Sequence, residues 1–335
     1  MAAALPPRSV GLVVVESSFA ALIGLSALLG NSILLASLYR KPRLKSSTEI
    51  LIGALAVTDL LNACIPGALF CSSLLTGKMS FSNFGCQISG FFMHFLTYVS
   101  MATMALTAIN RFFCVFKPNV YKKAFSYRRS MLYIASLWVF VAAVVFLPIV
   151  SGWSKFAFNP MMAACVMKFT NPMAEIGYTS FIVAVFVVWC FGIISICYFR
   201  VSRFIRQHNM NSISLSAQEI NLTKALFVLV FTFAALWVPA FMAIVLFRLM
   251  LRKKVSRHVV LVVPYLINLS SALNPWIYGV MCPAVRERMK KSLLSFACKQ
   301  RGSTVSPESG IIVVSALESS SANYTTLSVL PNVSS

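Results

Sequence analysis

The sequence predicts an all-α fold: a seven-transmembrane helix bundle with a short amphipathic cytoplasmic helix. Two observations carry this prediction. Of the 335 residues, 59% are hydrophobic and only 11% are charged, whereas soluble domains average roughly 25% charged residues. The apolar residues also fall in long runs, and a helix needs roughly 20 of them to cross a bilayer. Because unpaired backbone groups are too costly in lipid, each run must be helical.

Seven stretches qualify as membrane spans. They cover approximately residues 18–39, 48–72, 87–115, 131–151, 177–200, 224–248 and 258–281. Short polar or basic linkers join them, without a sequence repeat. We therefore expect four regions: a short extracellular N-terminus (1–17), the membrane domain (18–281), an amphipathic membrane-surface helix (282–300) and a disordered cytoplasmic Ser/Thr-rich tail (301–335).

The charge pattern predicts the orientation. The net charge is +21, from 29 Lys and Arg against 8 Asp and Glu. Most basic residues lie in linkers on one side of the membrane, which the positive-inside rule makes cytoplasmic. We expect a multi-pass plasma-membrane protein with an outer N-terminus, an inner C-terminus and no nucleic-acid partner. A basic group between Arg248 and Arg257 lies on the outer side and runs against the rule.

The segment after the last span is expected to lie on the inner leaflet. Its apolar residues Val285, Met289, Leu293 and Phe296 are spaced to share one helical face. Cys298, near the end of this segment, is a candidate for palmitoylation.

Asp59 is the only Asp in the chain and lies inside the second span. A carboxylate near the middle of a bilayer costs at least ~2.5 kcal/mol, so such a residue faces the bundle interior and is functional by default. A protonated Asp buried for packing is the alternative. Asn31 and Asn274, also inside spans, can supply hydrogen bonds to it.

The sixth span carries two features expected of a switch. Pro239 removes a backbone donor and kinks the helix, as Pro275 does in the seventh span. Such a kink is a candidate hinge, although prolines also occur in ordinary membrane helices. Glu219 opens the sixth span on the side where Arg111 ends the third, and an ion pair between them would hold two helix ends together. For Arg111 the alternative is an ordinary snorkelling anchor.

Cys86 and Cys165 are expected to form a disulfide. Cys86 begins the third span on the outer side, and Cys165 lies in the loop after the fourth. The cell exterior is oxidising, so the bond would fasten this loop across the mouth of the bundle.

The chain contains a series of short motifs: Gly30-Asn31, Leu55-Ala56-Val57-Thr58-Asp59, Asn110-Arg111-Phe112, Trp138, Tyr198, Phe233-Ala234-Ala235-Leu236-Trp237-Val238-Pro239 and Asn274-Pro275-Trp276-Ile277-Tyr278. In this order and at these separations, they resemble the motifs of rhodopsin-like (class A) G-protein-coupled receptors over nearly all of residues 18–300. The triplet at Arg111 and the region around Trp237 are similar to melatonin receptors. The resemblance implies a receptor for a small extracellular ligand that activates a heterotrimeric G protein by outward movement of the sixth helix. It further implies arrestin and a receptor kinase as partners.

The resemblance also assigns roles. A sodium pocket would comprise Asp59, Ser100, Ser271 and Asn274. Sodium is the only cofactor that we expect. The relay from the ligand would comprise Trp237, Phe233 and Pro239. The G-protein switch would comprise Arg111, Asn110, Glu219, Tyr198, Tyr278, Asn274 and Pro275. The ligand pocket would comprise Met93, His94, Thr97, Phe186, Phe241, Ile244, Tyr265 and Asn268.

The residues at two positions argue against two classes of ligand. Met93 stands where amine receptors carry an acid, and Asn268 stands where opsins carry the retinal-binding lysine. The resemblance therefore implies a neutral or lipophilic ligand rather than a charged amine or retinal. Asn110 replaces the acid usual beside Arg111, and Leu236 replaces a cysteine, which bears on basal activity rather than on fold.

Other functions remain open at this point. A receptor-like protein that has lost signalling fits the departures at Asn110 and Leu236. A small transporter or channel is disfavoured because transporters tend to show inverted repeats and charged midplane sites. An enzyme would need a nucleophile–base pair or metal ligands, which three scattered histidines do not supply. The sequence therefore predicts no enzymatic activity.

Overall fold

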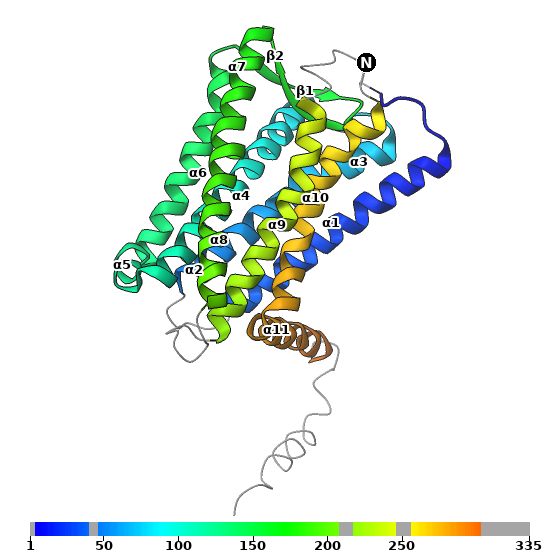
Figure 1. Cartoon of the computed structure of the whole chain (residues 1–335). Helices are drawn as coiled ribbons and strands as arrows, with labels where there is room; N and C mark the ends of the chain where they lie inside the picture. The colour runs from blue at the N-terminus through cyan, green and yellow to red at the C-terminus, as the bar shows by residue number, and fades with distance from the viewer. Residues whose placement is uncertain (1–3, 40–45, 208–216, 246–255, 303–335) are drawn as a thin grey trace, which may run out of the picture. The chain divides into compact units, whose positions relative to one another are not determined.

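The computed structural model of the chain describes residues 4–39, 46–207, 217–245 and 256–302. By its internal contacts the chain divides into a unit over Met1–Lys290 and a unit over Lys291–Ser335. The first unit contains a bundle of long helices that pack side by side (Figure 1).

The elements follow one another along the chain as helices interrupted by one hairpin. They are α1 (Val10–Tyr39), α2 (Ser47–Asn62), the π-helical turn η1 (Ala63–Gly67), α3 (Ala68–Thr76), α4 (Asn83–Phe116), α5 (Pro118–Ala124), α6 (Tyr127–Val150), β1 (Ser154–Asn159), β2 (Ala164–Phe169), α7 (Pro172–Ile182), the π-helical turn η2 (Val183–Trp189), α8 (Cys190–Gln207), α9 (Ala217–Val245), α10 (Arg257–Met281) and α11 (Pro283–Gly302).

The predicted spans each coincide with one helical segment. Among the described residues, six segments are long and apolar enough to cross a membrane: Val10–Tyr39, Ser47–Thr76, Asn83–Phe116, Tyr127–Val150, Pro172–Gln207 and Arg257–Met281. Helix α9, apolar over Ile220–Leu236, supplies the seventh helix of the bundle. The seven-helix fold is thus confirmed. The first helix begins at Val10 rather than at residue 18, because Glu16 lies inside it as a buried, ion-paired side chain.

Local sequence signals set several helix ends. Ser46 and Glu49 form a capping box at the start of α2, in which each side chain bonds the other residue's backbone N–H at 3.2 Å. Ser82 and Ser126 cap α4 and α6 in the same manner through one bond each. Gly77 ends α3 with φ of 70°, a left-handed conformation that favours glycine.

Two spans contain π-helical turns, which the periodicity of the sequence did not predict. In η1, Pro66 cannot donate a backbone hydrogen bond, and the turn widens to accommodate its ring. In η2 the described sequence has no proline. There, the Cys190 thiol donates to the Val185 carbonyl at 3.5 Å and so bonds an acceptor five residues earlier in the chain.

Helix α4 is the centre of the packing and contacts α2, α6, α8 and both strands. Helix α1 packs on α2, α3 and α10, and α9 packs on α10. The contact of α1 with α10 depends on Gly30, where an added Cβ would lie only 2.5 Å from Pro275 Cγ. Large apolar side chains cover the outer surfaces, such as Val139 at 70% and Trp189 at 69% exposure, as expected of helices that face lipid.

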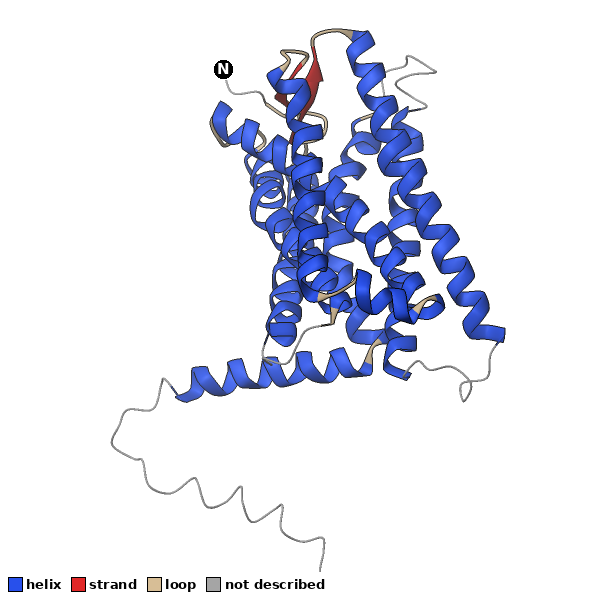
Figure 2. Cartoon of the chain, turned by 90° about the vertical axis from the view of Figure 1, so that its left-hand side faces the viewer, coloured by secondary structure: helices blue, strands red, loops and turns tan. Residues whose placement is uncertain are grey.

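The strands β1 and β2 form an antiparallel hairpin that pairs Ser154 with Phe169 and Asn159 with Ala164. The hairpin, red in Figure 2, lies at one end of the bundle, and α5 lies at the other (Figure 1). We call these the hairpin end and the α5 end.

Candidate functional site

The hairpin is fastened to α4 by covalent and polar contacts. A disulfide joins Cys86 to Cys165 of β2, with a Cα–Cα distance of 5.5 Å, which confirms the predicted bond. Gln87 Nε2 donates to the Phe156 carbonyl at 2.7 Å, and the Phe156 N–H donates to Gln87 Oε1 at 3.3 Å. The Phe156 ring lies against Gly90, where an added Cβ would be 2.6 Å from it. The hairpin therefore covers the end of the bundle in a fixed position.

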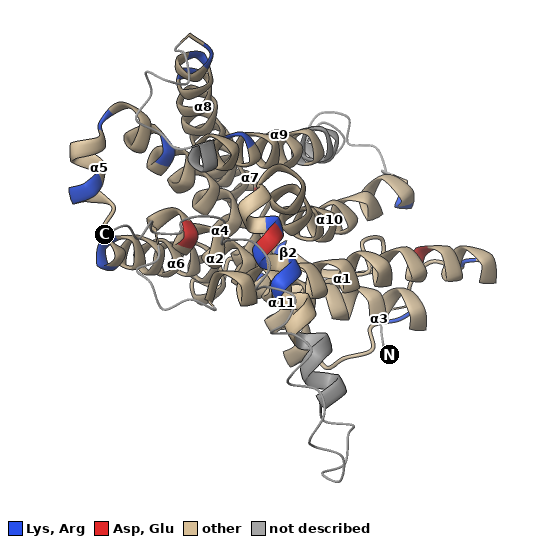
Figure 3. Cartoon of the chain, turned by 90° about the horizontal axis from the view of Figure 1, so that it is seen from below, with Lys and Arg blue, Asp and Glu red and all other residues tan. Residues whose placement is uncertain are grey.

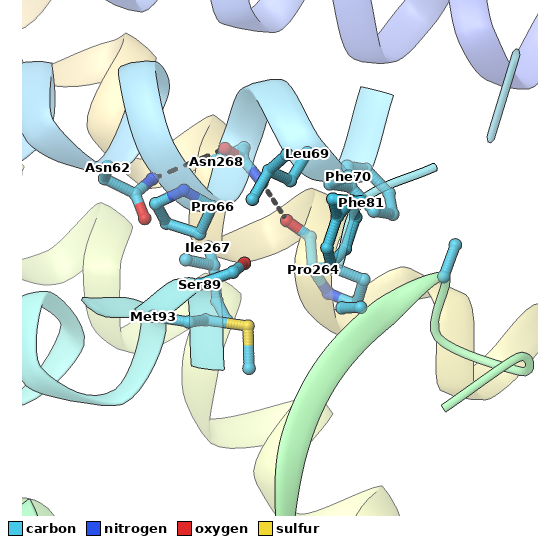
Figure 4. Close-up of a pocket in the computed structure, with 12 residues that line it drawn as sticks. Asn62, Pro66, Leu69, Phe70, Phe81, Ser89, Met93, Pro264, Ile267 and Asn268 are labelled. Carbon is cyan, nitrogen blue, oxygen red and sulfur yellow. Dashed lines mark hydrogen bonds between the residues drawn. The ribbon is translucent and has the colours of Figure 1, made fainter. Parts of the chain in front are cut away.

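A narrow cavity lies beneath the hairpin between η1, α3, α4 and α10 (Figure 4). Its volume is about 10 Å³, which is space for about one water molecule. Apolar side chains dominate its wall, and the polar side chains of Asn62, Ser89 and Asn268 face it. Asn62 Nδ2 donates to Asn268 Oδ1 at 3.4 Å, while Asn268 Nδ2 donates to the Pro264 carbonyl at 2.8 Å.

The structure places four of the predicted ligand residues in two separate cavities. Met93 and Asn268 line the cavity just described, whereas Thr97 and Phe186 line a second one of about 40 Å³ between α4 and η2. In this second cavity, Phe186 stacks on Tyr98 with ring centroids 4.8 Å apart.

Two further predicted ligand residues are engaged by the protein itself. The His94 ring bonds the Gly90 carbonyl through Nδ1 at 2.8 Å and lies against Phe156. The Tyr265 hydroxyl donates to the Glu16 carbonyl at 2.7 Å, and its ring meets Phe70 edge-on. The side chains of Phe241 and Ile244 lie outside the described residues.

Asp59 is the centre of a buried polar group in the middle of the bundle. Asn274 Nδ2 donates to Asp59 Oδ2 at 2.6 Å, and the Ser271 hydroxyl lies within bonding reach of the same carboxylate. Asn31 Nδ2 donates to the Ser271 carbonyl at 3.0 Å, and Asn62 Nδ2 donates to the Ser271 hydroxyl at 3.4 Å. The structure thus brings together Asp59, Ser271 and Asn274, three of the four residues of the predicted sodium pocket.

Two side-chain oxygen atoms near Asp59 are free to accept a further interaction. Asn31 Oδ1 and Asn62 Oδ1 are buried without a hydrogen-bond partner in the described part of the chain. Together with the Asp59 carboxylate, these oxygens are ligands of the type that a hard cation prefers. Ser100 is half-buried on α4 and forms no hydrogen bond within the described ranges.

Arg111 lies buried at the α5 end of the bundle and is held by neutral groups. Asn110 Oδ1 accepts from Arg111 Nε at 3.2 Å and from Nη2 at 2.9 Å. Nη2 also donates to the hydroxyls of Thr48 and Tyr121. Asn110 Nδ2 in turn donates to the Ser47 hydroxyl at 2.7 Å. These bonds join α4 to the start of α2 and to α5.

Two tyrosines predicted to belong to the switch are buried near the same end. Tyr198 is 3% exposed and Tyr278 is 1% exposed, and neither hydroxyl has a hydrogen-bond partner among the described atoms. Pro275 is buried against Gly30, and Phe233 of α9 is packed beside Phe191 at 6.2 Å between ring centroids.

Four other predicted site residues cannot be compared with the structure. The side chains of Glu219, Trp237 and Pro239 lie outside the described residues, as does that of Cys298. The predicted Arg111–Glu219 contact, the relay through Trp237, the hinge at Pro239 and the lipidation at Cys298 therefore stay predictions.

The structure also contains an ion cluster that sequence reasoning missed. Arg257 donates to both carboxylate oxygens of Glu16, at 2.7 and 2.8 Å, and Arg8 donates to Glu16 Oε2 at 2.8 Å. All three side chains are less than 10% exposed. Arg257 is one of the basic residues that run against the positive-inside rule, and this pairing explains its position.

Comparison with known proteins decides the family. A family model described as 7 transmembrane receptor (rhodopsin family) matches residues 30–278. The chain belongs to this family. The receptor is 25% identical to "Melatonin receptor type 1A" of Ovis aries over 276 residues, covering 80% of this chain and 74% of that protein. It is 23% identical to "Visual pigment-like receptor peropsin" of Homo sapiens over 291 residues, covering 85% of each chain.

A solved structure has the same fold. The crystal structure of squid rhodopsin covers 87% of both chains with a TM-score of 0.72 at 22% identity. The predicted resemblance to class A receptors, including melatonin receptors, is thus confirmed. The receptor is a multi-pass plasma-membrane protein of a G-protein-coupled family rather than a transporter or a channel.

Proposed function

We propose that the receptor binds a small neutral or lipophilic ligand from outside the cell and activates heterotrimeric G proteins through outward movement of α9. The observation that carries the proposal is the position of Arg111, buried at the α5 end with neutral partners on α2, α4 and α5. A charged side chain held only by neutral hydrogen bonds can exchange them for other bonds of similar net strength. Arg111 is therefore our candidate for the two-state element that a switch requires.

The proposed orientation places the hairpin end outside and the α5 end in the cytoplasm. Lys and Arg residues gather on α5, α8 and α11, as the view of the α5 end in Figure 3 shows. Examples are Lys122, Lys123, Arg203 and Arg286. This distribution supports a cytoplasmic α5 end by the positive-inside rule. The disulfide at the other end supports an oxidising exterior there.

A neutral ligand is supported by the walls of the two small cavities. Their described linings contain no charged side chain, and Met93 and Asn268 hold positions at which an acid or a lysine would favour other ligands. The relatives named for melatonin support a neutral compound, and Asn268 argues against a retinal pigment despite the similarity to peropsin.

Further parts of the proposal concern the ion and the later partners. Asp59, Ser271 and Asn274, with Ser100 on the facing helix, would hold a sodium ion, which supplies a positive charge beside the carboxylate. The Ser/Thr-rich tail over 301–335 would be phosphorylated by a receptor kinase and would then bind arrestin. A non-signalling receptor-like protein is the alternative.

The test is basal G-protein activation in cells across a panel of G proteins. Wild type, Arg111→Ala and Glu219→Ala are compared at matched surface expression, with the exposed Arg128→Ala as a control for loss of an inner basic residue. We expect no activation from Arg111→Ala, increased activation from Glu219→Ala and an unchanged level from Arg128→Ala. Activation by Arg111→Ala equal to wild type would reject the switch. Silence of all four proteins across the panel would favour the non-signalling alternative.

A further inference from the structure

A groove runs between α8 and α9 on the outer face of the bundle. Helix α8 packs along α4 and α9 packs along α10, but α8 and α9 contact each other over only a short stretch. The groove has a volume of about 660 Å³. This volume falls in the range of cavities that bind small molecules. It is far larger than the cavity beneath the hairpin and the cavity between α4 and η2.

The walls of the groove are apolar and aromatic. Phe199 of α8 is 65% exposed, and Phe227 and Phe231 of α9 are 45% and 66% exposed. All three line the groove, together with Ile194 and Val230. Because these rings face outward from a membrane bundle, their natural contacts are lipid hydrocarbon chains.

The end of the groove nearest the end of α8 is basic. Arg203 and Arg206 both line it, and residues three apart share one face of a helix. Both are exposed, and neither forms a salt bridge within the described ranges. Lys224 of α9, also exposed, precedes Phe227 by three residues and so lies on the same side of its helix.

An unpaired polar group lies deeper in the groove. Tyr198 is part of the lining, and its buried hydroxyl has no partner among the described atoms. An unpaired buried hydroxyl costs stability until it meets a donor or an acceptor. The groove thus combines apolar walls, a basic end and a free hydroxyl.

We propose that this groove binds an anionic phospholipid of the leaflet at the α5 end. The phosphate is held by Arg203 and Arg206, and one acyl chain lies between Phe199 and the rings of Phe227 and Phe231. Two guanidinium groups beside a lipid-facing apolar channel complement a headgroup of net negative charge, and the described lining has no acid that would favour a cationic or zwitterionic headgroup. Arginine is also suited to bidentate contacts with phosphate.

The test measures lipid binding to the full-length receptor by native mass spectrometry. Phosphatidylglycerol and phosphatidylcholine with identical acyl chains are the probes. Each basic residue near an anionic surface is worth about fivefold in affinity, so Arg203→Gln with Arg206→Gln should weaken phosphatidylglycerol binding by about 30-fold. The matched control, Arg128→Gln with Arg129→Gln, removes the same charge from α6 outside the groove. Equal losses in the two double variants would show non-specific surface attraction and reject the site.

A second measurement uses wild-type protein and does not depend on the variants being folded. Phosphatidylglycerol with a photoreactive group on one acyl chain is crosslinked to the receptor, and labelled peptides are identified. We expect label on the α8 and α9 peptides that contain Phe199 or Phe231, and its removal by excess unlabelled phosphatidylglycerol but not by phosphatidylcholine. Label spread evenly over the other lipid-facing helices would overturn the proposal.

Discussion

Glu16 and Arg257 form a two-bond ion pair, at 2.7 and 2.8 Å, that joins α1 to α10 near the hairpin end. Arg8 shares the same carboxylate and also donates to the Leu74 carbonyl at 2.7 Å. One carboxylate thus partly balances the charge of two buried guanidinium groups. The cluster connects the N-terminal segment with α1, α3 and α10.

Replacing Glu16 by Gln should strongly destabilise the receptor. The substitution leaves two buried arginines without a counter-charge, and removal of one partner of a buried pair costs about 3–5 kcal/mol. Thermal unfolding of the purified protein measures the loss. Tyr265→Phe is the matched control, because it removes only the hydrogen bond to the Glu16 carbonyl and should cost about 1 kcal/mol. Equal effects of the two substitutions would contradict a role for the charge.

Gly90→Ala should displace the hairpin. The new methyl group would lie 2.6 Å from the Phe156 ring, and such overpacking costs about 1–3 kcal/mol. Combining it with Phe156→Ala should remove the clash, so the two costs should be clearly non-additive in a double-mutant cycle of thermal unfolding. Mass spectrometry under non-reducing conditions verifies that the Cys86–Cys165 disulfide is intact in each variant. Additive costs would mean that the two residues do not meet.

Asn110→Asp should reduce basal G-protein activation. The new carboxylate would keep the contacts with Arg111 and add a charge, and charge-assisted bonds are roughly twice as strong as neutral ones. Asn110→Ala removes both bonds and should have the opposite effect. The two variants are compared by nucleotide exchange on purified G protein. A change in the same direction for both would argue that Asn110 acts through packing alone.

Asp59→Asn should abolish stabilisation by sodium. The substitution removes the only carboxylate of the buried group while retaining an acceptor for Asn274. The melting temperature of the wild type should be higher in sodium chloride than in choline chloride of equal concentration, because an ion that binds only the folded state stabilises it. The variant should show no difference. A persistent sodium effect in the variant would locate the ion elsewhere.

The sequence allowed prediction of the seven spans and the disulfide, because the spans follow from long apolar runs and the disulfide from the positions of two cysteines. The structure groups Asp59, Ser271 and Asn274, and their role in binding sodium stays a prediction. The hairpin could not be predicted. Its two short strands lie in a loop, and their position depends on tertiary contacts such as that of Phe156 with Gly90. Glu16 falls within the predicted extracellular N-terminus over residues 1–17, whereas the structure places it inside α1. Its partner Arg257 lies 241 residues away, which no local window can connect.

The π-helical turn η2 affects how residues of this receptor are aligned with those of its relatives. A π-helical turn adds one residue relative to an α-helix, and one residue corresponds to a rotation of about 100°. If one counts back from Tyr198 as though the helix were regular, the predicted direction of each side chain before η2 is therefore wrong by about this rotation. Phe186, inside the turn, is buried against Tyr98 in this chain. A substitution studied in a relative with a regular fifth helix should be mapped onto α7 with a shift of one residue.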